Sequence, residues 1–127
     1  MSATILVVED HPRNRKLVCD LLGFEGYQVL QAEDAEQAQS LLADTLPDLI
    51  LMDLDLPGMD GLSLTRLLKA EARTRAIPIV ALTAFAMPGD ERLALGAGCD
   101  GYLTKPLDTR AFAGQVAAFL SSPRSRP

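Results

Sequence analysis

The sequence predicts an α/β domain in which five parallel strands form one sheet with helices on both faces. Five short apolar runs alternate with five stretches whose apolar residues recur at helical spacing. This alternation favours right-handed crossovers and a doubly wound sheet without an internal linker or repeat. At 127 residues, of which 48% are hydrophobic, the chain suits one domain with its own core. We expect that domain to span residues 1–120 and the polar tail 121–127 to be disordered.

Each predicted strand is a short run rich in apolar and β-branched residues, as buried parallel strands are. The runs cover residues 4–8, 28–30, 49–52, 79–82 and 102–103. Ligands of such sheets bind beyond the carboxyl ends of the strands. The residues that follow each run are therefore the first place to look for chemistry.

The predicted helices show apolar residues three and four positions apart. They include Leu17, Val18, Leu21 and Leu22; Ala38, Leu41 and Leu42; Leu64, Leu67 and Leu68; the weaker stretch 88–95; and Phe112, Val116, Phe119 and Leu120. Asp34 followed by Gln37 resembles a capping box, and Pro12 and Pro88 suit first helical turns. Gly23 and Gly96 suit helix ends.

Charge and hydropathy argue against several classes of protein. A net charge of -5 disfavours direct binding to nucleic acid or to anionic lipid. The apolar runs are far shorter than the ~20 residues that span a bilayer, and no signal peptide is evident. We therefore expect a cytoplasmic protein without membrane contact. Its two cysteines, Cys19 and Cys99, are expected to be reduced and partly buried.

Polar side chains close four of the five predicted strands. Glu9 and Asp10 follow the first run, Asp53 the third, Thr83 the fourth, and Lys105 with Pro106 the fifth. Because parallel strands end at the same edge of a sheet, we expect these side chains to converge. Each alone is an ordinary cap, strand end or surface residue; their joint placement is what points to a site. Asp60 with Gly61 is interpreted only as a turn.

Three carboxylates brought together would repel one another, and a divalent cation relieves that repulsion. Mg²⁺ prefers oxygen ligands, waters and a phosphate oxygen, which suits an acidic edge without His or Cys clusters. Asp53 is then placed to act as a nucleophile toward phosphorus and form an acyl phosphate. Lys105 and Thr83 are placed to contact the phosphoryl oxygens.

Four segments, in this order and spacing, resemble the receiver domains of two-component response regulators. They are ILVVEDHPRNRKLV, PDLILMDLDLPGMDGL, PIVALTA and GYLTKPL, and the similarity extends from Thr4 to Leu120. The first segment is similar to the variant in cell-division single-domain regulators and in receivers attached to hybrid kinases. The resemblance implies a flavodoxin-like sheet in the order 2-1-3-4-5.

The resemblance also implies roles for the residues at the sheet edge. It makes Asp53 the phosphoacceptor, Asp10 a direct Mg²⁺ ligand, Glu9 a ligand through water, and the Asp55 backbone carbonyl a further ligand. Lys105 and Thr83 would hold the phosphoryl group. Thr83 and Tyr102 would form the switch, with Tyr102 reporting phosphorylation through its rotamer, and the bond before Pro106 is expected to be cis.

Two positions near this edge are less usual for the family. Asp55 adds a carboxylate, and Phe85 places a bulky ring two residues after Thr83.

The output face is expected at the fourth helix, fifth strand and fifth helix, with candidate contacts Arg92, Leu95, Leu103, Arg110 and Phe112.

The family also implies the partners. The phosphoryl donor would be a histidine kinase or a histidine phosphotransfer protein. The seven residues after Leu120 are too short for an output domain, so output is expected through another protein. We expect a monomer or a weak phosphorylation-dependent dimer, and no enzyme activity beyond self-phosphorylation and self-dephosphorylation.

Two alternatives remain open at this point. LILMDLDLP resembles the Asp-x-Asp signature of haloacid dehalogenase-type phosphatases, although that signature belongs on a first strand and Glu9 and Asp10 here precede Asp53. The second alternative is a receiver-like module that binds partners without being phosphorylated.

Overall fold

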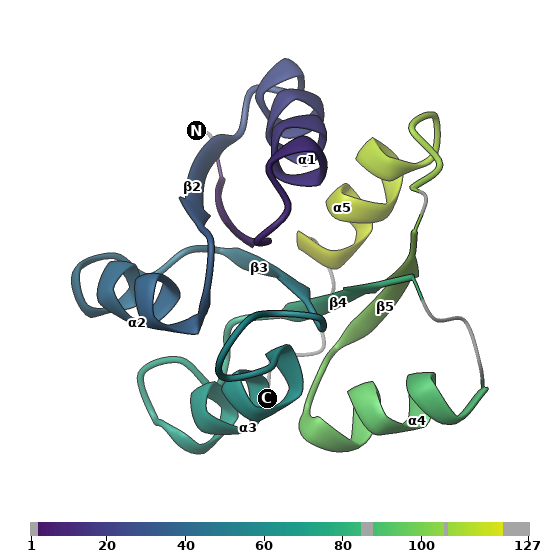
Figure 1. Cartoon of the computed structure of the whole chain (residues 1–127). Helices are drawn as coiled ribbons and strands as arrows, with labels where there is room; N and C mark the ends of the chain where they lie inside the picture. The colour runs from purple at the N-terminus through teal and green to yellow at the C-terminus, as the bar shows by residue number, and fades with distance from the viewer. Residues whose placement is uncertain (1–2, 85–87, 106, 121–127) are drawn as a thin grey trace.

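The computed structural model describes residues 3–84, 88–105 and 107–120 (Figure 1). Strands and helices alternate along the whole of this chain. Their order is β1 (Thr4–Val8), α1 (Pro12–Phe24), β2 (Gln28–Ala32), α2 (Ala35–Asp44), β3 (Leu49–Asp53), α3 (Gly61–Ala70), β4 (Ile79–Thr83), α4 (Pro88–Ala97), β5 (Gly101–Thr104) and α5 (Phe112–Leu120).

All neighbouring strands run parallel, in the order β2-β1-β3-β4-β5, which confirms the predicted flavodoxin-like topology. β1 and β3 are separated in sequence by β2 but lie side by side, with Val8 opposite Met52. β4 then pairs with β5, with Thr83 opposite Thr104. The carboxyl ends of β1, β3, β4 and β5 therefore lie at one edge of the sheet.

The strand side chains alternate between two separate apolar cores. Ile50 and Met52 of β3 pack into one core, and Leu49 and Leu51 pack into the other. Figure 1 shows α2, α3 and α4 on one face of the sheet and α1 and α5 on the other. Every β3 side chain is buried because helices cover both faces, which explains its continuous apolar sequence.

Several element ends differ from the sequence prediction by one or two residues. β2 continues to Ala32, and β3 and β4 include Asp53 and Thr83 themselves. The Asp34 cap is confirmed: its carboxylate accepts from the Gln37 N–H, and the Gln37 side chain accepts from the Glu33 N–H. Pro12 and Pro88 begin α1 and α4 as predicted.

Gly23 and Gly96 lie at helix ends as predicted, each one residue before the last residue of its helix, but neither is the residue that terminates the helix. Gly23 and Gly96 are still helical, and the nearby glycines just beyond the two helices, Gly26 (φ 89°) and Gly98 (φ 112°), have positive φ. Only the second glycine of each pair occupies the left-handed region, where other residues are strained. Sequence alone does not say which of two nearby glycines takes that conformation.

Three predictions fall on residues outside the described chain: the bulky ring at Phe85, the cis bond at Pro106 and the disordered tail 121–127.

Within the described chain, no helix has the length and apolar character needed to cross a bilayer. Cys19 is half-buried and Cys99 buried, both as free thiols, and burial raises the pKa of each thiol.

α5 can pack closely against β5 because residue 101 is a glycine. A Cβ at Gly101 would overlap the Phe119 ring of α5. The glycine therefore lets α5 pack directly on the start of the strand that leads to Lys105.

Asp60, interpreted from the sequence only as part of a turn, caps α3. Its carboxylate accepts from the Ser63 N–H at 2.8 Å and from the Ser63 hydroxyl at 3.1 Å. The hydrogen bond from the Ser63 backbone is the main reason why the pKa of Asp60 lies below its ordinary value of 3.8. The charged cap therefore stabilises the folded state at neutral pH.

We expect Asp60→Ala to lower the free energy of unfolding by about 1 kcal/mol at pH 7, whereas Asp60→Asn, which can still cap, should stay within about 0.5 kcal/mol of the parent. Because the folded pKa is depressed, the contribution of the charge is complete above the unfolded value and declines as pH falls through the folded pKa. Urea unfolding at pH 7 and pH 3 measures this. If Asp60→Ala lowers the free energy of unfolding by the same amount at pH 7 and at pH 3, the charge of Asp60 does not contribute to stability and the prediction is wrong.

Candidate functional site

The strand-end side chains predicted from the sequence do converge. Glu9 follows β1 and is completely buried; Asp53 at the end of β3 is 2% exposed, and Thr83 at the end of β4 is 1% exposed. Asp10 is exposed. Carboxylate oxygens of Glu9, Asp10 and Asp53 all lie within 4.8 Å of one another.

Lys105, just beyond β5, contacts two of these carboxylates. Its Nζ lies 2.8 Å from Oε1 of Glu9 and 3.2 Å from Oδ2 of Asp53. The Lys105 N–H donates to the Thr83 carbonyl at 2.7 Å, which holds the start of the β5–α5 connection against β4. One half-buried ammonium group therefore serves two buried carboxylates that are far apart in sequence.

This arrangement leaves the local charge unbalanced. Burial, reinforced by the hydrogen bond and charge of Asp53 and opposed by Lys105, raises the pKa of Glu9 to about 7. Burial alone would lower the pKa of Lys105, but its hydrogen bond to Glu9 and the charge of Asp53 outweigh burial and raise it. The site therefore favours an added positive charge.

The donor set fits a hard divalent cation. The three clustered groups are all carboxylates, and exposed Asp10 keeps the cluster open to solvent on one side. Oxygen-only ligands with room for water are what Mg²⁺ prefers. Asp55 also follows Asp53, but its side chain is exposed and is not part of this cluster.

The β3–α3 loop holds the Asp53 carboxylate in place. The Asp55 N–H donates to Oδ1 of Asp53 at 3.0 Å, so both carboxylate oxygens have a donor. α3 begins very close to this loop, because a Cβ at Gly61 would overlap the Asp53 carbonyl oxygen. Gly61 is thus a position that must lack a side chain, a constraint that the Asp60-Gly61 turn signal did not reveal.

Arg15 is a further residue that the sequence reasoning missed. Its Nη1 donates to the Glu9 carbonyl at 3.0 Å and to the Asp10 carbonyl at 3.5 Å, and it lies 3.9 Å from Oε1 of Glu33. One turn into α1, Arg15 therefore fixes the backbone that presents the two acids. The available signal was its position in the first turn of the helix that Pro12 begins, four residues after the N-cap position at His11.

Thr83 and Tyr102, the predicted switch pair, lie on adjacent strands. Tyr102 pairs in register with Ala81, two residues before Thr83, and is half-buried against the core under α2, α3 and α4. Thr83 also lines a hollow of about 310 Å³ together with Asp55, Arg66 and Leu93. Space is therefore present beside the Thr83 side chain, between the β3–α3 loop and α4.

Two of the predicted output contacts were wrong. Leu103 is 8% exposed and Phe112 1% exposed, because both belong to the core under α1 and α5. Arg92, Leu95 and Arg110 are exposed, and their role as output contacts stays a prediction. Leu93 of α4, 55% exposed, is an apolar surface residue that the sequence did not single out.

A model of the response regulator receiver domain matches residues 5–117. The chain belongs to this family. It is a receiver domain of phosphorelay signalling, and the resemblance inferred from the four sequence segments is confirmed. The chain therefore does not belong to the haloacid dehalogenase-type phosphatases, the other family that its LILMDLDLP segment resembles.

Curated and solved relatives agree with the family. The polar-differentiation response regulator DivK of Brucella ovis is 38% identical over 120 residues, which cover 94% of this receiver and 98% of DivK. The receiver of a sensor histidine kinase from Pseudomonas aeruginosa PAO1 superposes with a TM-score of 0.88 at 37% identity, covering 96% of this chain and all of that one. That structure has a magnesium ion coordinated in its active site cleft.

A third relative is the signal receiver domain of a histidine kinase from Syntrophus aciditrophicus, with a TM-score of 0.87 and 36% identity. The match covers 94% of this chain and 91% of that one. This receiver is thus similar both to a single-domain regulator and to receivers of histidine kinases.

Replacing Asp53 by Asn should stabilise the metal-free receiver, because Lys105 would then neutralise Glu9 alone. Glu9 has a folded pKa above its unfolded value of 4.5, so it reduces stability as pH rises from about 4.5 to about 7. We expect a gain of about 1 kcal/mol at pH 8 and less at pH 5, measured by urea unfolding in EDTA. Asp55→Asn, an exposed neighbour, is the control and should change stability by less than about 0.5 kcal/mol. Equal effects of the two substitutions would contradict the proposed repulsion.

Proposed function

We propose that Asp53 accepts a phosphoryl group from a phosphohistidine donor with Mg²⁺ bound beside it. The observation that supports this most directly is the placement of Lys105 Nζ against Asp53 and Glu9 within the three-carboxylate cluster. Asp10 and Asp53 would coordinate Mg²⁺ directly, Glu9 through water, and the Asp55 backbone carbonyl would complete the protein ligands. When bound, the ion supplies positive charge that offsets repulsion between the carboxylate and the incoming phosphate.

The transfer forms one bond and breaks one bond. A carboxylate oxygen of Asp53 bonds to phosphorus, the phosphorus–nitrogen bond of the donor breaks, and the imidazole leaves with the electron pair. The Asp55 N–H orients the carboxylate, and buried surroundings limit access of water to it. Lys105 and the Thr83 hydroxyl would contact phosphoryl oxygens where negative charge accumulates.

The acyl phosphate would act on the switch through charge. A group of ~-2 charge beside Thr83 favours an inward hydroxyl, which changes the space available to Tyr102 and to the α4–β5–α5 face. The donor would be a histidine kinase or a histidine phosphotransfer protein in the cytoplasm, and the output a protein partner. The receiver would act as a monomer or a weak phosphorylation-dependent dimer, with self-dephosphorylation as its only turnover.

Incubation with acetyl phosphate should add one phosphoryl group per chain in Mg²⁺, seen as a mass increase by intact-protein mass spectrometry. Labelling should be lost in EDTA and in Asp53→Ala, because both the nucleophile and the cation are required. Asp55→Ala is the matched control, since it removes a carboxylate two residues away and should still be labelled.

The outcomes separate this proposal from its alternatives. Labelling of Asp53→Ala as strong as that of the parent would place the phosphoryl group elsewhere. A parent that is never labelled would support the module that binds partners without phosphorylation. Sustained release of phosphate from a phosphomonoester, beyond one per chain, would support phosphatase chemistry.

Mg²⁺ should raise the thermal stability of the parent, because the ion binds the folded cluster and not the unfolded chain. At a hundred times the dissociation constant the gain is about 2.7 kcal/mol. Asp10→Asn should remove most of this gain, while Asp44→Asn, at the exposed end of α2, should retain it. Melting curves with increasing MgCl₂ measure the difference; an unchanged response of Asp10→Asn would contradict the ligand assignment.

A further inference from the structure

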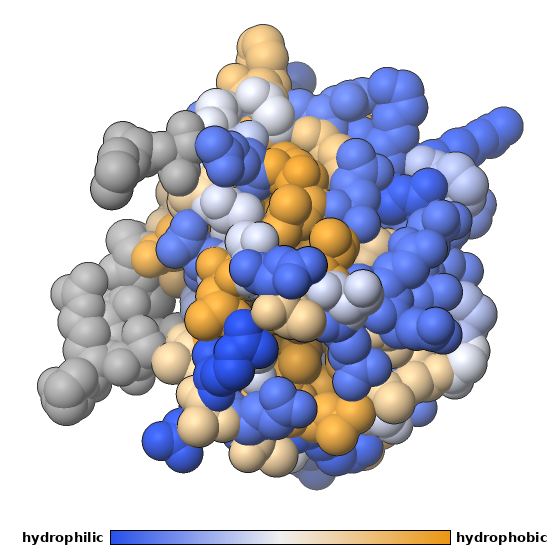
Figure 2. All heavy atoms as spheres, turned by 90° about the vertical axis from the view of Figure 1, so that its left-hand side faces the viewer, coloured by the Kyte–Doolittle hydropathy of each residue, from blue (hydrophilic) through white to orange (hydrophobic). Residues whose placement is uncertain are grey.

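The charges of this receiver are strongly segregated along the chain. From Leu17 to Thr65 there is no Lys, Arg or His, and this stretch contains ten of the 17 acidic residues. It forms most of α1, then β2, α2, β3 and the start of α3. Figure 2 shows the side of the molecule on which β2 and α2 lie, where apolar side chains are visible between hydrophilic ones.

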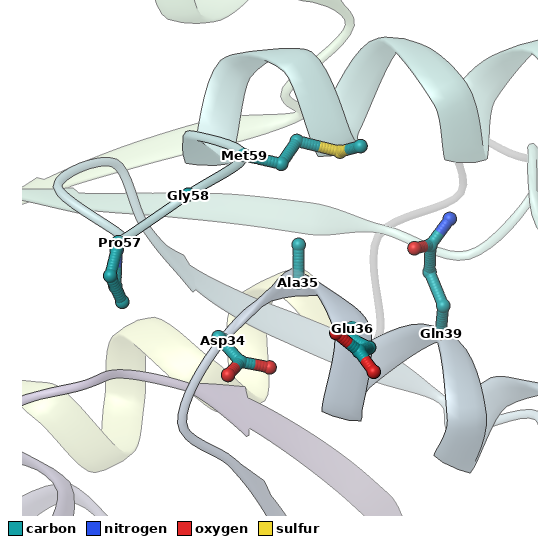
Figure 3. A pocket seen from close by; sticks show the side chains of 7 residues that line it. All are labelled: Asp34, Ala35, Glu36, Gln39, Pro57, Gly58 and Met59. Atoms are coloured by element: carbon teal, nitrogen blue, oxygen red, sulfur yellow. The ribbon is translucent and has the colours of Figure 1, made fainter.

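A groove of about 460 Å³ lies within this acidic stretch, between the start of α2 and the β3–α3 loop. Its lining is Asp34, Ala35, Glu36, Gln39, Pro57, Gly58 and Met59. In Figure 3, Ala35 points from α2 toward the loop, with the carboxylates of Asp34 and Glu36 on either side of it. The groove thus combines an apolar base with an acidic rim.

Both walls of the groove are held by hydrogen bonds. On one side, the Asp34 carboxylate accepts from the Gln37 N–H and the Gln37 side chain accepts from the Glu33 N–H, which fixes the first turn of α2. On the other, Gly58 has a φ of 72° and the Asp60 cap fixes the start of α3. Met59 is nevertheless 38% exposed, so an unbranched, adaptable apolar side chain is available at the surface. The groove is therefore formed before any partner binds.

No base described near the groove neutralises its rim. Arg15 is engaged with the carbonyls after β1 and approaches Glu33, not Asp34 or Glu36. Arg73 donates to the Leu42 carbonyl, at the other end of α2. The partial positive charge of the α2 N-terminus, about half a unit, is smaller than the two full negative charges.

We infer that this groove docks an extended segment of a partner protein in which an Arg or Lys side chain adjoins an apolar residue. The aliphatic stem of the basic side chain would lie over Ala35 and Met59, and its charged head would reach the Asp34 and Glu36 carboxylates. Charge complementarity favours such a segment over an acidic one or a second copy of this acidic chain. The inference does not depend on phosphorylation of Asp53.

The test is an NMR titration of the ¹⁵N-labelled receiver with acetyl-Leu-Arg-Leu-Arg-amide. Saturable shifts are expected at the amides of Ala35, Gln39, Gly58 and Met59. The double variant Asp34→Asn/Glu36→Gln keeps a capping side chain and removes two rim charges, so affinity should fall about fivefold. The matched control Glu25→Gln/Asp44→Asn removes two exposed charges of the same acidic stretch outside the groove, and should change affinity less than about twofold.

Three results would overturn the inference. The first is equal weakening in the two double variants, which indicates diffuse attraction to the acidic side. The second is equal binding of acetyl-Leu-Glu-Leu-Glu-amide. The third is a change in the chemical shifts of the groove amides when the receiver is concentrated in the absence of peptide. That result indicates self-association through the groove. Melting curves of both variants confirm that they are folded.

Discussion

The receiver depends on one ammonium group placed between two buried carboxylates. Lys105 contacts Glu9 and Asp53; Lys105 and Glu9 directly follow β5 and β1, and Asp53 is the last residue of β3. The parallel order β1-β3-β4-β5 brings those three strand ends to one edge of the sheet. Because one positive charge does not neutralise two buried negative charges and a third nearby, the metal-free site keeps a deficit that a cation relieves. That deficit is a local loss of stability in the metal-free receiver.

The packing around the site shows how narrowly the sheet edge is defined. Gly61 allows the start of α3 to approach the Asp53 carbonyl, and Gly101 allows Phe119 to cover the start of β5. Arg15 adds a third constraint through the backbone of Glu9 and Asp10. Each of these features acts on the backbone next to a residue of the cluster. The orientation of the carboxylates therefore depends on the packing and hydrogen bonds of neighbouring residues as well as on contacts of the carboxylates.

The sequence predicted the sheet and the converging residues because both depend on periodicity and on which residue ends each strand. It did not predict the burial of Leu103 and Phe112, since apolar residues on an expected output face are also the ones that fill the core. Nor did it identify Asp60 as a cap or Arg15 as a backbone clamp, because those roles depend on exact helix starts and long side-chain contacts. For the same reason, local signals did not separate Gly23 from Gly26.

The segregation of charge relates the site to the rest of the surface. Asp53 and the Asp34–Glu36 rim belong to the same acidic stretch, whereas Lys105 comes from the distant end of the chain. Repulsion between exposed charges of that stretch is screened over about 10 Å in ordinary buffers. The backbone connects Asp53 to the groove directly. The loop that follows β3 after Asp53 continues through Pro57 and Met59, which line the groove. A partner seated there would contact the segment whose backbone already orients the carboxylate.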